Sequence, residues 1–170
     1  RDCASVGKER LHASGRSCAG WTARRFFAKG LFQVMKGIAD TGFLVAFARR
    51  SDFHHEWAVG LAAQVAEPLL TCDAVLAEAA FHLEDTALAL EFVRQGLVAP
   101  VLDVADHMPR LLQIARRFAD QKPDLADVCL IRLSELYPHH PVITVDSKDF
   151  RVYRRNRREV IPLIAPPLLK

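Results

Sequence analysis

The sequence predicts a three-layer α/β/α domain built on a central, mainly parallel sheet of about five strands. Short apolar runs alternate along the chain with longer segments whose apolar residues recur at helical spacing. The short runs lack polar alternation, which is typical of strands that are covered by helices on both faces. The length of 170 residues, with 51% hydrophobic and 25% charged residues, fits one globular domain with one core.

Five apolar runs are the predicted strands, and aspartates mark the predicted helix starts between them. The strands are expected at 37–39, 68–71, 97–102, 142–145 and 160–164. Helices are expected to begin at Asp52, Asp73, Asp106 and Asp124. The stretch 84–95 is expected to continue helically until Gly96, and Pro123 is expected to end the helix that precedes it.

Residues 1–34 differ from the rest because they mix Gly, Ser, Ala and Arg without a sustained period. We interpret them as a basic extension, disordered or not native to the working protein, and place the folded domain at 35–170, starting at Met35. A targeting presequence, an upstream read-through or expression remnant, and a genuine basic arm remain the alternatives. A secretory signal is disfavoured because no apolar run of about 7–15 residues follows the charges.

The net charge of +3 conceals an acidic body between two basic ends. Residues 1–35 hold seven Lys/Arg against two acids, residues 36–150 hold ten against seventeen, and five arginines fall within 151–158. The four cysteines form no CxxC pair, so we expect a reduced cytoplasmic protein without structural zinc. No apolar run approaches the roughly 20 residues of a membrane-spanning helix, so no membrane association is expected.

Acidic residues stand where several predicted strands end. Asp40 and Asp146 directly follow two strands, Glu78 lies one turn into a helix, and Asp124 and Asp127 share one helix face. Carboxylates gathered at one sheet edge repel one another, and a divalent cation such as Mg²⁺ or Mn²⁺ relieves that repulsion. Such a cation supports phosphodiester hydrolysis. The alternative for an aspartate at a helix start is an N-cap without chemical function.

Four segments resemble the motifs of PIN-domain nucleases, particularly VapC-type toxins. They are 38–47 (IADTGFLVAF), 71–81 (TCDAVLAEAAF), 124–130 (DLADVCL) and 144–150 (TVDSKDF). In this order they resemble the family's opening strand and turn, its second-acid segment, its third-acid helix and its fourth-acid segment. The resemblance covers 36–165, and the departures at Val128, Cys129 and Arg132 remove no carboxylate.

The resemblance implies a PIN-like nuclease domain over 35–170 that cleaves single-stranded RNA with Mg²⁺ or Mn²⁺. Its catalytic acids would be Asp40, Glu78, Asp127 and Asp146, and its metal ligands Asp40, Asp127 and Asp146. It also implies a homodimer that is neutralised by a small antitoxin protein.

Some assignments stay open within this resemblance. Asp124 remains an alternative to Asp127, and Asp149 to Asp146. The hydroxyls of Thr41 and Thr144 are expected to orient a carboxylate or a water.

Other prominent side chains have structural interpretations. The pairs His54–His55 and His139–His140 are expected to be exposed turn residues. His82 follows Glu78 by one helical turn and could approach the acids, although a structural role is favoured. Trp57 and Phe81 are expected to pack in the core or at a dimer interface. The arginines of 151–158 are a candidate surface for RNA phosphates or an antitoxin, or else a solvated helix face.

The leading functional hypothesis is therefore a metal-dependent endoribonuclease of the toxin type. A non-catalytic PIN-like module that binds RNA or protein is the second hypothesis, and a phosphatase or DNA nuclease is the third.

Overall fold

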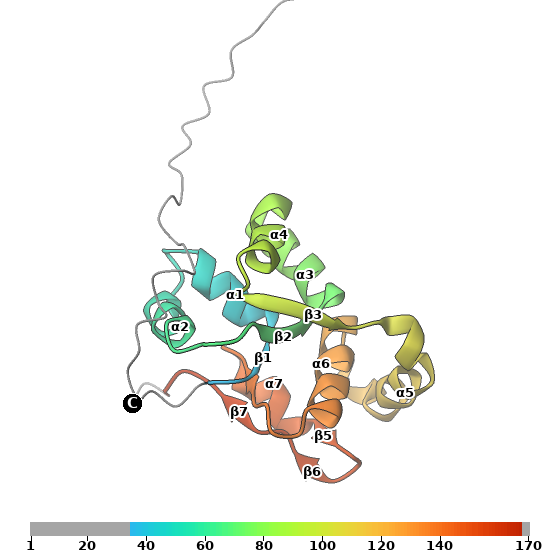
Figure 1. Ribbon diagram of the computed structural model, residues 1–170. Helices are drawn as coiled ribbons and strands as arrows, with labels where there is room; N and C mark the ends of the chain where they lie inside the picture. Colours follow the sequence, from blue (N-terminus) through green and yellow to red (C-terminus); the bar gives the residue numbers. More distant parts are fainter. Residues whose placement is uncertain (1–34, 168–170) are drawn as a thin grey trace, which may run out of the picture.

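A five-stranded sheet, parallel throughout, forms the middle layer of the protein (Figure 1). The computed structural model describes residues 35–167, and the extension expected over 1–34 lies outside these residues. The strands are β1 (Ile38–Ala39), β2 (Leu69–Cys72), β3 (Val98–Leu102), β4 (Val142–Ile143) and β7 (Leu163–Ile164). They lie in the order β3-β2-β1-β4-β7, which confirms the predicted fold class.

Helices cover both faces of this sheet. They are α1 (Thr41–Ala48), α2 (His55–Ala62), α3 (Asp73–Leu83), α4 (Thr86–Arg94), α5 (Val104–Arg117), α6 (Leu125–Leu136) and α7 (Ser147–Val152). Helix α1 contacts α2 and α3, and α3 contacts α4, whereas α6 contacts α5 and packs on β1 and β2 (Figure 1). None of the helices between residues 35 and 167 combines the length and apolar character that crossing a bilayer requires.

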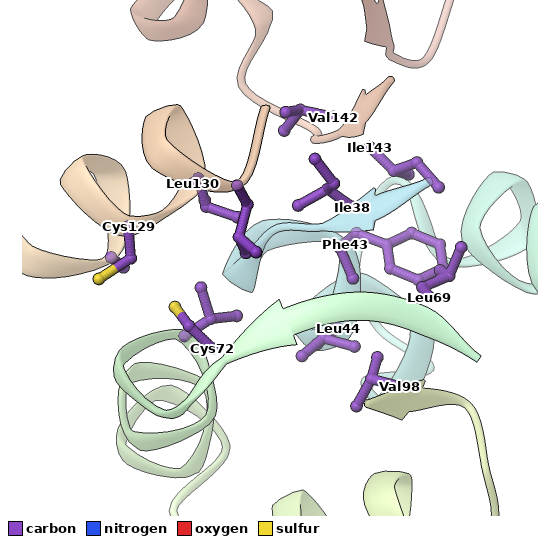
Figure 2. Packing of buried hydrophobic residues seen from close by; sticks show 14 of the residues in the cluster. Ile38, Phe43, Leu44, Leu69, Cys72, Val98, Cys129, Leu130, Val142 and Ile143 are labelled. Atoms are coloured by element: carbon purple, nitrogen blue, oxygen red, sulfur yellow. The ribbon is translucent and has the colours of Figure 1, made fainter. Parts of the chain in front are cut away.

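The core lies where the short strands meet the helices. Figure 2 shows side chains of β1, β2, β3 and β4 meeting those of α1 and α6, and Ile38, Phe43 and Leu130 are fully buried there. The thiols of Cys72 and Cys129 lie near each other at the end of β2 and on α6, and both are free (Figure 2). Burial on both faces explains why the strand sequences are apolar without alternation.

The predicted helix start is correct at Asp124, where the side chain accepts a hydrogen bond from the backbone N–H of Asp127 (2.8 Å). It is wrong at Asp52, which caps a turn by accepting from the N–H of His54 (2.8 Å) before α2 begins. It is also wrong at Asp73, because this residue is already the first of α3.

The helices around residue 84 and residue 106 also differ from the prediction. Glu84 has a φ of 56°, so α3 ends there, and Asp85 caps a separate helix, α4. Helix α5 begins at Val104 with Asp103 as its cap, not at Asp106. It ends at Arg117, followed by the short 3₁₀ turn η2 (Ala119–Gln121), and thus stops before Pro123.

The last predicted strand, 160–164, is two strands. The first, β6 (Glu159–Val160), pairs antiparallel with β5 (Arg154–Arg155) in a separate hairpin. The second, β7, pairs parallel with β4 at the sheet edge. Pro162 lies between them and has no N–H to donate, but its carbonyl accepts from the N–H of Val142 (2.8 Å).

Candidate active site

A cavity of about 340 Å³ opens beyond the carboxyl ends of β1 and β4. All four predicted catalytic acids line it: Asp40, Glu78, Asp127 and Asp146. Asp52 and Asp124 add two more carboxylates, and no Lys or Arg of the described chain lines this cavity. The sheet topology thus brings together the four predicted acids from four separate stretches of sequence, as expected for a parallel sheet.

Asp40 is the half-buried acid at the centre of this cavity. It ends β1 and caps α1, where its Oδ1 accepts from the backbone N–H of Thr41 (2.6 Å). Burial, together with the negative charges of Asp127 and Glu78, raises the pKa of Asp40 to about 6, although hydrogen bonds from the Thr144 hydroxyl and the Thr41 backbone oppose the shift. Three carboxylates therefore lie within electrostatic reach of one another.

Threonine hydroxyls hold two of these acids. The Thr41 hydroxyl donates to Glu78 Oε2 (2.7 Å), which ties α1 to α3. The hydroxyl of Thr144 hydrogen-bonds the Asp40 carboxylate and accepts from the backbone N–H of Asp146 (2.9 Å). Both threonines are buried, with 5% and 0% of their surface exposed, and both orient carboxylates as the sequence suggested.

The paired acids of α6 have different surroundings. Asp124 is exposed and is used as the cap of the helix. Asp127 is half-buried in the cavity wall, and its Oδ2 accepts from the Tyr153 hydroxyl (3.1 Å). Asp127 is therefore the more enclosed of the two acids, whereas Asp124 serves as the cap of α6.

Asp146 reaches the cavity from the opposite side. It is exposed and caps α7 by accepting from the backbone N–H of Lys148 (3.0 Å). The side chain of its alternative, Asp149, lies outside the described part of the structure. Three of the candidate acids are thus helix caps as well, so capping and a place in the cavity coexist in Asp40, Asp124 and Asp146.

The donor chemistry of the cavity fits a hard divalent cation because its strong ligands, apart from the imidazole of His82, are carboxylate oxygens. As they are placed, no three His, Cys, Asp or Glu side chains between residues 35 and 167 converge closely enough to hold a metal ion. Hydrogen bonds from three hydroxyl groups fix the carboxylates of Glu78, Asp40 and Asp127. The carboxylates of Asp124 and Asp146 accept hydrogen bonds as helix caps. Small side-chain rotations are therefore part of any cation binding here.

Two further cavity residues were not among the predicted site residues. His82 lines the cavity with its Nε2 3.6 Å from Glu78 Oε1, and half of its side chain is exposed, so it does approach the acids. Asp52 lines the same wall from the loop between α1 and α2. In the sequence, the i, i+4 spacing from Glu78 indicated that His82 could lie near the acids. The sequence around Asp52 indicated only a helix cap and no place in the cavity.

The expectations for the other aromatic residues are met in part. Trp57 packs edge-on against Phe43 in the core (ring centroids 6.1 Å apart). Phe81 is 78% exposed and therefore lies outside the core. His54 and His55 are half-buried, not exposed, and His55 Nδ1 lies 2.9 Å from the carbonyl oxygen of Ala46.

The arginine run 151–158 does not form one helix face. It spans the end of α7, strand β5 and the turn that follows. Arg155 is 9% exposed, and its Nη1 donates to the carbonyls of Ser134 and Pro138 (2.9 Å each). One arginine of the run is thus a structural residue of the core edge, because the β5–β6 hairpin folds it back onto α6.

Gly42 of α1 lines the cavity and leaves no room for a side chain. A Cβ at this position would lie 2.6 Å from Cγ2 of Val145, the residue before Asp146. We expect Gly42→Ala to lower the free energy of unfolding by about 1–3 kcal/mol, because the stiff valine must move. Urea unfolding measures this loss.

Gly60→Ala in α2 is the matched control for that change. Nothing lies within 4 Å of the added Cβ there, so the usual gain of up to about 1 kcal/mol for Gly→Ala in a helix is expected. Equal stabilisation by both substitutions would show that Val145 does not restrict the wall of the cavity.

The comparisons with known proteins agree with this geometry. The family model described as PIN domain matches residues 38–156, from β1 to the turn after β5, and includes every acid of the cavity. A comparison with curated proteins finds no match.

Proposed function

Because the chain belongs to the PIN domain family, we propose that it is a metal-dependent endoribonuclease that hydrolyses single-stranded RNA. The observation that carries the proposal is the close grouping of Asp40, Glu78 and Asp127 in one open cavity, where burial and the charges of Asp127 and Glu78 raise the pKa of Asp40. A carboxyl group in a cavity whose pKa is raised by burial and by neighbouring charges is a candidate functional group. Family membership supports nuclease chemistry, and the resemblance to toxin nucleases supports RNA as the substrate.

In the proposed mechanism, Asp40, Asp127 and Asp146 hold Mg²⁺ or Mn²⁺. When bound, this cation stabilises the charge that develops on the phosphoryl oxygens. Thr144 orients Asp40, and Tyr153 orients Asp127, so that two of the acids are positioned before the substrate arrives. Glu78, fixed by Thr41, faces the same cavity and completes the set of catalytic acids by positioning water.

The biological role we propose is that of a toxin which acts as a homodimer and is neutralised by a small antitoxin protein. The four motif segments 38–47, 71–81, 124–130 and 144–150 support this role through their resemblance to VapC-type toxins. Light scattering of the purified chain tests the dimer, and a short neighbouring gene whose product binds the chain and inhibits it tests the antitoxin.

The direct test is digestion of single-stranded RNA, single-stranded DNA and a phosphomonoester in Mg²⁺ or Mn²⁺. We expect RNA cleavage, and we expect EDTA to abolish it. Asp40→Asn should reduce the rate by more than about 10- to 100-fold, the loss that is typical when only a residue behind a metal ligand is changed. Asp85→Asn, the same substitution at the cap of α4 outside the cavity, is the control and should cleave normally.

Three results would contradict the proposal. Cleavage by Asp40→Asn at the normal rate would place the activity elsewhere. A protein that binds RNA but never cleaves it would be a non-catalytic module. Preferential hydrolysis of DNA or of the phosphomonoester would change the substrate class.

A further inference from the structure

A second cavity, of about 210 Å³, lies outside the acidic site, between α5, α6 and the β5–β6 hairpin. Four of its lining side chains are arginines, and one is a carboxylate; we call it the arginine cleft. Its charged residues are Arg110, Arg117, Arg154, Arg157 and Glu135. Cations from separate stretches of chain thus gather around one small hollow in a body that is otherwise acidic.

The single carboxylate of the cleft is already neutralised. Glu135 accepts from Arg110 Nε (2.9 Å) and from Arg132 Nη1 (3.0 Å), and only 3% of its side chain is exposed. None of the described carboxylates lies within ion-pair distance of Arg117, Arg154 or Arg157. The cleft therefore holds three positive charges that have no anionic partner among the described residues.

Hydrogen bonds to backbone carbonyls hold the guanidinium groups of Arg154 and Arg117 in place. Arg154 Nη1 donates to the carbonyls of Arg151 (2.6 Å) and Tyr153 (2.7 Å), and Arg117 donates to the carbonyl of Arg157. Guanidinium groups held in this way keep further N–H donors for a ligand, since each carries five. Little conformational entropy is then lost when an anion binds.

The turn that carries Arg157 is itself unusual. Asn156 and Arg157 have φ values of 44° and 74°, a region that Asn tolerates and Arg seldom adopts. Glu135 fixes the turn by accepting from the backbone N–H of Asn156 (3.1 Å). Positive φ values are common in hairpin turns, and here the turn places Arg157 at the edge of the cavity.

Two aromatic rings that pack edge to face lie between the arginine cleft and the acidic site. Phe118 lines the cleft and packs edge-on against Tyr153 (ring centroids 5.1 Å apart). The hydroxyl of Tyr153 donates to Asp127 in the acidic cavity. The two sites thus lie on opposite sides of one buried tyrosine, in a single packed unit.

We propose that the arginine cleft binds a backbone phosphate of the RNA strand, away from the scissile bond. The inference rests on the proposed function, since it assigns a second contact to the same substrate. Guanidinium groups bind phosphate oxygens in a bidentate manner, and the cleft has room for a phosphate group but not for a helix of a partner protein. Contacts of this kind position a strand without reading its sequence.

The test measures the binding of a short, labelled single-stranded RNA by fluorescence anisotropy in EDTA, where the metal needed for cleavage is removed. We expect Arg157→Asn and Arg117→Gln each to weaken binding several-fold and to lower the salt dependence, by about 0.7 in the log–log slope for each phosphate that is no longer bound. Asn suits the positive φ of position 157, so this variant should fold normally.

Arg94→Asn is the control because it removes the same charge at the end of α4, where the side chain is 73% exposed. It should bind RNA as the unchanged protein does. Unfolding curves of all variants show whether weaker binding reflects a loss of structure.

The outcomes separate this inference from the proposed function. Normal RNA binding by Arg157→Asn and Arg117→Gln overturns the inference, whereas the cleavage assay decides the function independently. If the two variants lose affinity only for inorganic tripolyphosphate, the cleft serves a free oligophosphate and the inference is wrong. If they lose affinity only for a glutamate-rich peptide, it serves a protein partner and the inference is again wrong.

Discussion

Replacing Glu135 with alanine should lower the free energy of unfolding by about 3–5 kcal/mol. Glu135 is a buried carboxylate of α6, with 3% of its side chain exposed, and it joins three parts of the fold. It accepts hydrogen bonds from Arg110 of α5, from Arg132 of α6 and from the backbone N–H of Asn156 in the β5–β6 turn. Removing it leaves two arginines without their anion and the turn without its acceptor.

The same carboxylate should also make stability depend on pH. Burial opposes the ionisation of Glu135, but the hydrogen bonds from Arg110 and Arg132 outweigh it and hold its pKa below the usual value. A carboxyl group whose pKa is lower in the folded state stabilises the protein above its unfolded pKa of 4.5. That contribution is lost as the pH falls below this value, and Glu135→Ala should remove this part of the acid sensitivity.

Urea unfolding at neutral pH and at acid pH measures both effects. Glu91→Ala is the control at neutral pH, since Glu91 pairs with Arg94 at the surface of α4 and its removal should cost much less stability. If Glu135→Ala lowers the free energy of unfolding no more than Glu91→Ala does, the network around Glu135 contributes no more to stability than a surface ion pair.

The sheet and the acidic cavity were predictable because their signals are local. A buried parallel strand is apolar throughout, so Asp40 and Asp146 were visible as the charges that interrupt two apolar runs. The carboxyl ends of parallel strands meet at one edge, which places these two acids in a common cavity whatever the details of the helices. Glu78 and Asp127 followed from the resemblance to family motifs.

Contacts between distant parts of the chain were not predictable in this way. Glu135 lies in an ordinary helical pattern, and nothing local shows that Arg110, 25 positions earlier, reaches it. Arg155 looks like one member of a basic run but is buried, because the β5–β6 hairpin brings it to the carbonyls of Ser134 and Pro138. The helix starts at Asp73 and Asp106 were wrong for a smaller reason, since an aspartate in the first turn and an aspartate at the cap give similar patterns.

The second large effect is expected at Asp40, where the substitution that we expect to abolish cleavage should also stabilise the metal-free protein. Asp40 has a pKa of about 6 in the folded protein against 3.8 as its ordinary value, mainly because it is buried. Between these two pH values the folded state binds more protons than the unfolded state does. The free energy of unfolding therefore falls as the pH rises from about 4 to about 6 and stays level above that range.

Asparagine cannot ionise, so the free energy of unfolding of Asp40→Asn should not fall in this way as the pH rises. At pH 7 in EDTA the variant should be more stable than the unchanged protein by at most about 3 kcal/mol, the equivalent of the pKa difference. Near pH 4 the two proteins should have similar stability. Asn is as good an N-cap as Asp, so α1 should begin at Thr41 in both proteins.

Added Mg²⁺ should reverse the order of stability at pH 7. A cation that binds only the folded state stabilises it, and the unchanged protein keeps the carboxylate that binds the cation. Thermal unfolding across pH, with EDTA and then with Mg²⁺, measures all these differences, and Asp85→Asn at the cap of α4 serves as the control. Parallel pH profiles of stability for Asp40→Asn and the unchanged protein would mean that the pKa of Asp40 is not raised in the folded protein.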